Sequence, residues 1–182
     1  MEKVFLFLAD GFEETEAIAV ADVLLRGGIE LYTVSISDNK VVKGAHGISV
    51  VADQLLSQIE TEKAKCLVFP GGMPGAKNIA ENKKVIELLQ HHYDQNGWVA
   101  AICAAPALVL SQLKTDRKLQ VTCYPGFEQY LPYATVLSDG VVVDGKVITG
   151  KGPGFAIEFG LTVLKHLVSP EMAKEVAAGM LL

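Results

Sequence analysis

Short apolar runs of strand length alternate along this chain with runs in which apolar residues recur every three or four positions. The apolar runs cover residues 3–9, 30–37, 66–69 and 98–102. The runs with helical spacing cover residues 13–26, 83–94 and 155–167. Strands that alternate with helices favour an α/β fold with a mostly parallel central sheet.

Turn signals organise the remaining segments. Glycines at 44 and 47 interrupt a short hairpin predicted over 41–51, and Asp144-Gly145 lies at the centre of a second hairpin over 141–149. Ser169-Pro170-Glu171 combines an N-cap residue with a first-turn proline and acid, so a last helix is expected to begin there.

The composition is typical of a chain with a sizeable core. Half of the 182 residues are hydrophobic and the mean hydropathy is +0.31, but no apolar run reaches the roughly 20 residues that span a bilayer. The first residues lack the basic, apolar and cleavage-site pattern of a signal peptide. With no linker, repeat or low-complexity segment, residues 1–182 are interpreted as one domain.

Charge and cysteine content narrow the expected partners. The net charge is −5 and the basic residues are scattered, which argues against a nucleic-acid partner. The three cysteines cannot all pair within one chain and form no C-x-x-C, which favours a reducing compartment such as the cytoplasm. No group of His, Cys, Asp or Glu has metal-ligand spacing, so no metal or other cofactor is expected.

The clearest candidate for chemistry is Cys103, directly after the apolar run 98–102. Alanines stand two residues before and two residues after it, and Pro106 opens a helix-forming stretch over 107–113. Small residues around a nucleophile at a sharp strand-to-helix turn are typical of a nucleophile elbow, and a helix N-terminus favours the thiolate. The alternative interpretation of Cys103 is a small buried apolar residue.

Glu13, Glu14 and Glu16 follow the first predicted strand. Acids in a first helical turn complement the helix dipole, which is sufficient to explain them. Alternatively, one carboxyl faces the cysteine, where burial would keep it protonated and able to donate to the sulfur or to move protons. Helical periodicity places Glu13 nearer the apolar stripe than Glu16, and that stripe is expected to contain Ala17, Val20, Ala21, Leu24 and Leu25.

Two glycine-rich segments have both a structural and a functional interpretation. Gly71-Gly72 forms either an ordinary turn or, together with the amide of Ala104, a pair of backbone donors for an oxyanion. Gly152-Pro153-Gly154 is open to the same two interpretations. Ligands bind at the carboxyl ends of strands in open α/β sheets, so the loops at 10–16, 70–76 and 103–106 are expected to converge.

The other candidate residues have mainly structural interpretations. Cys66 is predicted to belong to the core, and Cys123 is interpreted as structural. His91 and His92 are predicted to lie on a solvated helix face, while His46 stands in a glycine-flanked loop that could approach a site.

Four motifs occur in an order that resembles the ThiJ/PfpI superfamily. They are LADGFEETE at 8–16, VFPGG at 68–72, AICAAP at 101–106 and GKGPG at 150–154. More narrowly, they resemble the clade of the parkinsonism-associated protein deglycase and its bacterial relatives.

The resemblance implies a flavodoxin-like three-layer sandwich, a homodimer and an oxidation-prone nucleophile at Cys103. It places the partner carboxyl at Glu16 rather than Glu13, and the oxyanion amides at Gly72 and Ala104. It also implies several residues that line the site, namely Gly71, Tyr124, Gly152, Pro153 and His46. Arg26 matches a basic position that lines the site near the dimer interface.

The activity that the resemblance implies is a glutathione-independent glyoxalase or deglycase that acts on α-oxoaldehydes or their glycated adducts without a cofactor. One alternative is a non-catalytic oxidative-stress sensor or chaperone, in which the same cysteine is oxidised. Another is thiazole monophosphate biosynthesis, an older family label for which the sequence offers no phosphate-binding basis. A flavin site on the same fold is disfavoured, because the acidic loop at 10–16 would repel a phosphate.

Two positions depart from the family pattern. Tyr124 stands where some relatives place a histidine, and His46 aligns with a basic residue of the loop near the partner's site.

A PfpI-type cysteine peptidase carries a histidine directly after the nucleophile, where this chain has Ala104. A related amidotransferase needs a later His-x-Glu pair, which the residues after His166 do not supply.

Overall fold

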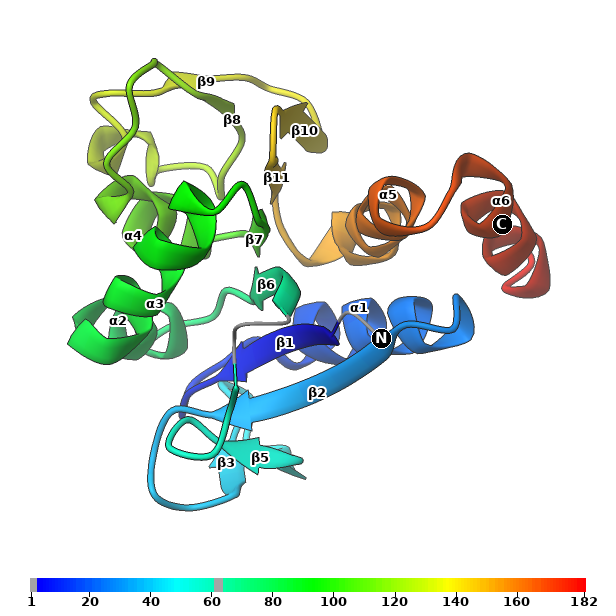
Figure 1. Cartoon of the computed structure of the whole chain (residues 1–182), viewed down its shortest axis with the longest axis horizontal. Helices are drawn as coiled ribbons and strands as arrows, with labels where there is room; N and C mark the ends of the chain where they lie inside the picture. Colours follow the sequence, from blue (N-terminus) through cyan, green and yellow to red (C-terminus); the bar gives the residue numbers. More distant parts are fainter. Residues whose placement is uncertain (1–2, 61–63) are drawn as a thin grey trace.

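A seven-stranded sheet, parallel through its centre, runs through the molecule (Figure 1). The computed structural model describes residues 3–60 and 64–182. The strands lie in the spatial order β10 (Val141–Asp144), β11 (Val147–Gly150), β7 (Trp98–Ile102), β6 (Ala64–Phe69), β1 (Lys3–Leu8), β2 (Glu30–Ser35) and β5 (Gln54–Leu55). β10 alone pairs antiparallel within this described sheet. The strands β2-β1-β6-β7-β11 have the 2-1-3-4-5 order of flavodoxin-like folds, so the predicted fold class is confirmed.

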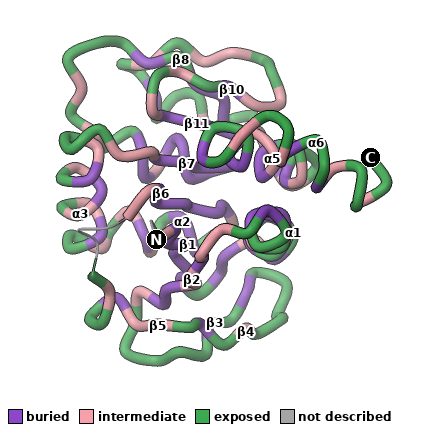
Figure 2. The backbone as a smooth tube through the Cα atoms, turned by 45° about the vertical axis from the view of Figure 1, so that its right-hand side comes forward, coloured by how far each residue is buried: buried purple, intermediate pink, exposed green. Residues whose placement is uncertain are grey.

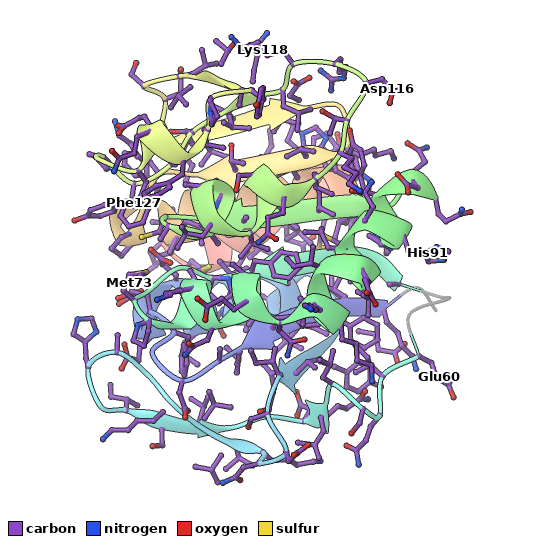
Figure 3. The ribbon with its side chains drawn as sticks, turned by 90° about the vertical axis from the view of Figure 1, so that its left-hand side faces the viewer. Glu60, Met73, His91, Asp116, Lys118 and Phe127 are labelled. Atoms are coloured by element: carbon purple, nitrogen blue, oxygen red, sulfur yellow. The ribbon has the colours of Figure 1, made fainter. Side chains whose placement is uncertain are left out.

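Helices cover both faces of the sheet and complete the three layers (Figure 2). On one face lie α1 (Glu14–Arg26), α5 (Ala156–Leu167) and α6 (Pro170–Gly179). On the other, which faces the viewer in Figure 3, lie α2 (Gly75–Glu81), α3 (Lys83–Asp94) and α4 (Ala105–Leu108). This double coverage explains why β1, β6 and β7 are almost continuously apolar, since a parallel sheet is buried on both sides.

Smaller elements lie outside the main sheet. They are the antiparallel pair β3 (Val41–Lys43) and β4 (Ser49–Val51), the parallel pair β8 (Gln120–Val121) and β9 (Thr135–Val136), and the 3-10 turns η2 (Leu110–Gln112), η3 (Glu128–Tyr130) and η4 (Pro153–Phe155). No helix in the part of the chain that the structure describes is both long and apolar enough to cross a membrane.

Most predicted segments match the structure to within one or two residues. The hairpin around 144 is formed by β10 and β11, although Asp144 itself pairs with Val147, so the turn residues are Gly145 and Lys146. The helix expected over 107–113 is wrong in its bounds: α4 ends at Leu108, and the 3-10 turn η2 follows. α2, β5, β8 and β9 were not anticipated, because short elements carry little periodicity.

Two predictions of exposure are wrong. Leu25, predicted to lie on the buried stripe of α1, is 54% exposed. Ala17, Val20 and Leu24 of that stripe are buried as predicted, and Glu16 and Val23 are buried with them. His92 is buried rather than solvated, and its Nε2 lies 3.0 Å from the carbonyl oxygen of Trp98. A single-sequence pattern does not reveal that this end of α3 packs against the start of β7.

Stacked aromatic rings fill the core beside the central strands. Phe7 in β1 and Phe69 in β6 have ring centroids 5.1 Å apart with planes at 13°, and both side chains are fully buried. We expect Phe7→Ala to lower the free energy of unfolding by about 3–5 kcal/mol, because the ring leaves a cavity between two strands. Urea denaturation would measure the loss. The matched control is Tyr133→Ala, whose ring is 87% exposed and whose removal should change stability by less than about 0.5 kcal/mol.

Candidate functional site

Three loops converge at the carboxyl ends of neighbouring strands β1, β6 and β7. The loop after β1 is joined to the loop after β6 by hydrogen bonds from the Glu13 N–H to the Gly71 carbonyl (3.0 Å) and from the Gly75 N–H to the Gly11 carbonyl (3.1 Å). A side chain at Gly72 would collide with the backbone around Phe12 and Glu13, which explains the glycine there. The expected convergence of these loops is confirmed.

Cys103 occupies the turn directly after β7, with a φ of 66°. This left-handed conformation is uncommon for a residue with a side chain and marks a strained position. Neighbouring backbone holds it on both sides: the Cys103 N–H donates to the Gly150 carbonyl (2.9 Å), and the Cys103 carbonyl accepts from the Tyr124 N–H (2.8 Å). The local geometry is therefore that of an elbow.

Glu16 is the glutamate that the fold brings to the cysteine. Its side chain is fully buried, and its Oε2 accepts a hydrogen bond from the Gly71 N–H (2.7 Å). Its Oε1 is buried without a hydrogen-bond partner among the described residues. Glu13 instead caps α1, accepting from the Glu16 N–H (2.6 Å). The choice of Glu13 by periodicity is thus wrong in placement, because the cap turns Glu13 back onto its own helix.

Gly71 lies so close to the Glu16 carboxyl and the Cys103 sulfur that no side chain fits at this position. A Cβ at this position would lie 2.5 Å from Cys103 Cβ, 2.7 Å from Glu16 Oε2 and 3.0 Å from Cys103 Sγ. The three residues therefore form one packed unit, in which only glycine allows the other two to approach.

Burial and mutual charge govern the ionisation of this pair. Burial raises the pKa of the Glu16 carboxyl to about 7, against the hydrogen bonds to Cys103 and Gly71, which lower it. Burial also raises the pKa of the Cys103 thiol, and the charge of Glu16 raises it further. Both effects oppose the thiolate that the helix N-terminus was expected to favour. Because two adjacent charges repel, the pair loses one proton near neutrality and resists losing the second.

Two backbone N–H groups face the sulfur. Hydrogen bonds from the amides of Gly72 and Ala104 act to lower the pKa of the Cys103 thiol. They come from two different loops, after β6 and after β7, so the sheet order brings them together. Donors in this arrangement favour negative charge on the sulfur or on an atom bound to it.

Tyr124, Gly152 and Pro153 also lie beside the elbow, on the side of β11. They line an open depression of about 220 Å³ together with Pro125, Lys151, Gly154 and Phe155. Phe155 was not singled out from the sequence, because its position next to Tyr124 depends on how the chain turns after β11.

His46 reaches the N-terminal turn of α1 from the loop between β3 and β4. Its Nδ1 lies 2.8 Å from Glu14 Oε2 and 4.0 Å from Glu13 Oε1, and its N–H donates to Glu14 Oε1 (2.7 Å). The hydrogen bond to Glu14 raises the pKa of His46. Glu14, which is nearly fully buried, therefore anchors this loop.

Three side chains from two separate segments could together ligate a metal ion, contrary to the expectation from sequence spacing. Ligand atoms of Glu13, Glu14 and His46 lie within 4.8 Å of one another, although 32 residues separate Glu14 from His46. Spacing along the chain could not show this, since the loop folds back onto the helix. Both oxygens of Glu14 already have partners in the loop, which accounts for the cluster as a structural contact.

The remaining candidates lie apart from the pair. Arg26 stands at the last turn of α1, about 15 Å along the helix from Glu16, and forms an exposed ion pair with Asp22 (2.7 Å). Within one chain it does not join the site. Cys66 is fully buried in β6, and burial raises its pKa; burial likewise raises the pKa of the Cys123 thiol to about 11.

Comparison with known proteins decides the family. Residues 2–166 match the DJ-1/PfpI family. The chain belongs to this family. Protein DJ-1 homolog B from Arabidopsis thaliana is 37% identical over 183 residues; the match covers all of this chain but only 42% of the relative, so the chain spans less than half of that protein.

Other members of the DJ-1/PfpI family match over most of their length. The Caenorhabditis elegans protein named glutathione-independent glyoxalase DJR-1.2 is 35% identical, over 87% of this chain and 84% of its own. The solved structure of oxidized Toxoplasma gondii DJ-1 has a TM-score of 0.93 at 37% identity and covers all of this chain and 98% of that one.

We expect Gly71→Ala to disrupt the packed unit. The added methyl group must displace Cys103 or Glu16, at a cost of about 1–3 kcal/mol in unfolding free energy and with a changed rate of Cys103 alkylation by iodoacetamide. Gly179→Ala is the control, because its added carbon would point into open space, away from the rest of the protein. Unaltered stability and alkylation in Gly71→Ala would contradict the close packing described above.

The raised pKa of Glu16 predicts a pH-dependent loss of stability. The carboxyl holds its proton in the folded protein up to about pH 7 but loses it near 4.5 when unfolded, so its contribution falls as the pH rises between these values. Glu16→Gln should remove this loss. The free energy of unfolding of the variant, relative to that of wild type, should therefore rise by about 3 kcal/mol from about pH 4 to about pH 8. Denaturation at both pH values, with Glu175→Gln as an exposed control, tests this; equal pH dependence in wild type and Glu16→Gln would refute it.

Proposed function

We propose that this protein is a cysteine-dependent, glutathione-independent glyoxalase or deglycase that acts on small α-oxoaldehydes or their adducts. The observation that carries the proposal is the buried Glu16 carboxyl, packed against the elbow cysteine across Gly71. Membership of the DJ-1/PfpI family supports it, as does the name of the worm relative.

The reactive form is the one in which Cys103 is the thiolate and Glu16 holds the proton. The sulfur attacks the aldehyde carbon, and the resulting alkoxide takes the Glu16 proton to give a hemithioacetal. The Glu16 carboxylate then removes the hydrogen on that carbon and returns a proton to the neighbouring carbon, while the hydroxyl proton passes to the former ketone oxygen, which yields a 2-hydroxy acid thioester. Water hydrolyses the thioester and restores the thiol.

The surroundings of the pair suit each step. The N–H groups of Gly72 and Ala104 would stabilise the oxyanion or the sulfur anion, and burial keeps the proton on Glu16 until the alkoxide needs it. Position 124 is a tyrosine and offers no imidazole. Among the described residues, Glu16 is the titratable side chain that shifts the pKa of Cys103, so it carries the proton transfers in this mechanism.

The expected setting is a homodimer in a reducing compartment such as the cytoplasm. Arg26, which lies away from the site of its own chain, would then stand near the subunit interface, and His46 would lie close to the partner's site. No metal, nucleic acid or membrane is needed for the chemistry.

The first test is lactate formation from methylglyoxal without glutathione, measured for wild type, Cys103→Ser and Glu16→Gln. We expect turnover in wild type and buffer-level rates in both variants, because one lacks the thiolate and the other cannot exchange a proton. Glu16→Gln should still react with iodoacetamide at Cys103, which separates lost proton transfer from a lost nucleophile. The exposed variant Glu175→Gln serves as the control and should retain wild-type turnover.

A wild-type protein without turnover on methylglyoxal and without action on glycated thiols would favour the oxidative-stress sensor instead. In that case, mild peroxide should add two oxygen atoms at Cys103, visible by intact mass. The thiazole monophosphate and cysteine peptidase assignments gain no support from the residues around Cys103.

A further inference from the structure

The open depression beside Cys103 has apolar walls. Its lining residues are glycines, prolines and two aromatic residues, apart from Lys151. The Lys151 ammonium donates to the carbonyl oxygen of Ser138 (2.9 Å), so its charge is engaged elsewhere. The surface left for a ligand is therefore aromatic and aliphatic.

The two rings that form the walls are held in place by glycines. The Phe155 ring occupies the space where a side chain of Gly140 would stand, so the ring packs against Gly140. The Tyr124 ring lies over Gly152, with its Cδ2 3.3 Å from the position of a Cβ there, and meets Phe127 edge-on with centroids 6.3 Å apart. Both rings nevertheless remain partly open, with Tyr124 45% and Phe155 36% exposed.

The depression adjoins the nucleophile through its backbone. Tyr124 donates its N–H to the Cys103 carbonyl, and Cys103 donates its own N–H to Gly150, the residue before Lys151. One wall thus begins at Tyr124, which is hydrogen-bonded to Cys103. The other begins at Lys151, which follows the hydrogen-bonded residue Gly150. The backbone contacts therefore place the depression next to the elbow residue.

From these contacts we infer that the depression binds an aromatic ring of the substrate, so that the protein prefers aryl α-oxoaldehydes to aliphatic ones, a preference that rests on the aldehyde chemistry proposed above. The volume of about 220 Å³ exceeds the roughly 150 Å³ that accommodates a benzene ring in an apolar cavity. A phenyl group would contact both rings, with the offset or edge-on geometry that aromatic pairs favour, whereas a methyl group is too small to touch both.

Steady-state kinetics with phenylglyoxal and methylglyoxal test this preference, with mandelate and lactate as the products measured. We expect kcat/KM for phenylglyoxal to exceed that for methylglyoxal by about tenfold in wild type, and this ratio to fall about tenfold in Phe155→Ala. Gly152→Val should lower the ratio as well, by filling the space between the rings. Tyr133→Ala, an exposed ring outside the depression, is the matched control and should leave the ratio unchanged.

A second measurement does not need turnover. Phenacyl bromide and bromoacetone alkylate a thiolate by forming a C–S bond as bromide leaves, and intact mass follows the labelling of Cys103. After normalisation to the reaction of each reagent with a free small thiol, the aryl reagent should label wild type about tenfold faster than bromoacetone, and Phe155→Ala should abolish this advantage.

The two measurements separate the possible failures. Preferential aryl labelling without turnover of either aldehyde would uphold the aromatic subsite and overturn the proposed function. Turnover of both aldehydes with a ratio that neither Phe155→Ala nor Gly152→Val changes would uphold the function and overturn the subsite. Thermal melting of each variant checks that it is folded, and because one variant removes a ring and the other adds bulk, a shared change in the ratio is not explained by misfolding.

Discussion

The close approach of Cys103 and Glu16 across Gly71 is the constraint on which the site depends. With no side chain at 71, the buried Glu16 carboxyl and the Cys103 sulfur can both lie against the same stretch of backbone. Water cannot solvate both ions there, so burial raises the pKa of both groups, and the charge of Glu16 raises that of the Cys103 thiol further. A nucleophile with a proton carrier at its side results from packing, without a histidine.

The surrounding loops keep this unit in place. The Gly71 carbonyl accepts from Glu13, whose carboxylate caps α1 and so orients the turn that carries Glu16. Farther out, Glu14 holds the loop between β3 and β4 through the backbone and ring of His46. The glutamates after β1 therefore divide into a helix cap, a loop anchor and a buried partner for the cysteine.

Local strain and a buried carboxyl are costs to folding that functional sites commonly retain. Cys103 has a left-handed backbone conformation, and Glu16 would be more stable in water above neutral pH. The apolar strands and stacked core rings offset these costs, because β1, β6 and β7 bury nearly all of their side chains. The family membership is consistent with a site retained for its chemistry, and Tyr124 and Phe155 line the open depression beside it.

The sequence by itself determined the α/β class, the main strands and helices, and the elbow at Cys103, because these depend on local periodicity and on small residues around one turn. It predicted Glu16 only through the family resemblance, since periodicity favoured Glu13. The tertiary structure decided which carboxyl meets the sulfur, that His46 meets Glu14, that His92 is buried and that Phe155 lines one depression with Tyr124. Those contacts join residues far apart in the chain, and their geometry depends on strand order and helix caps, which no local pattern encodes.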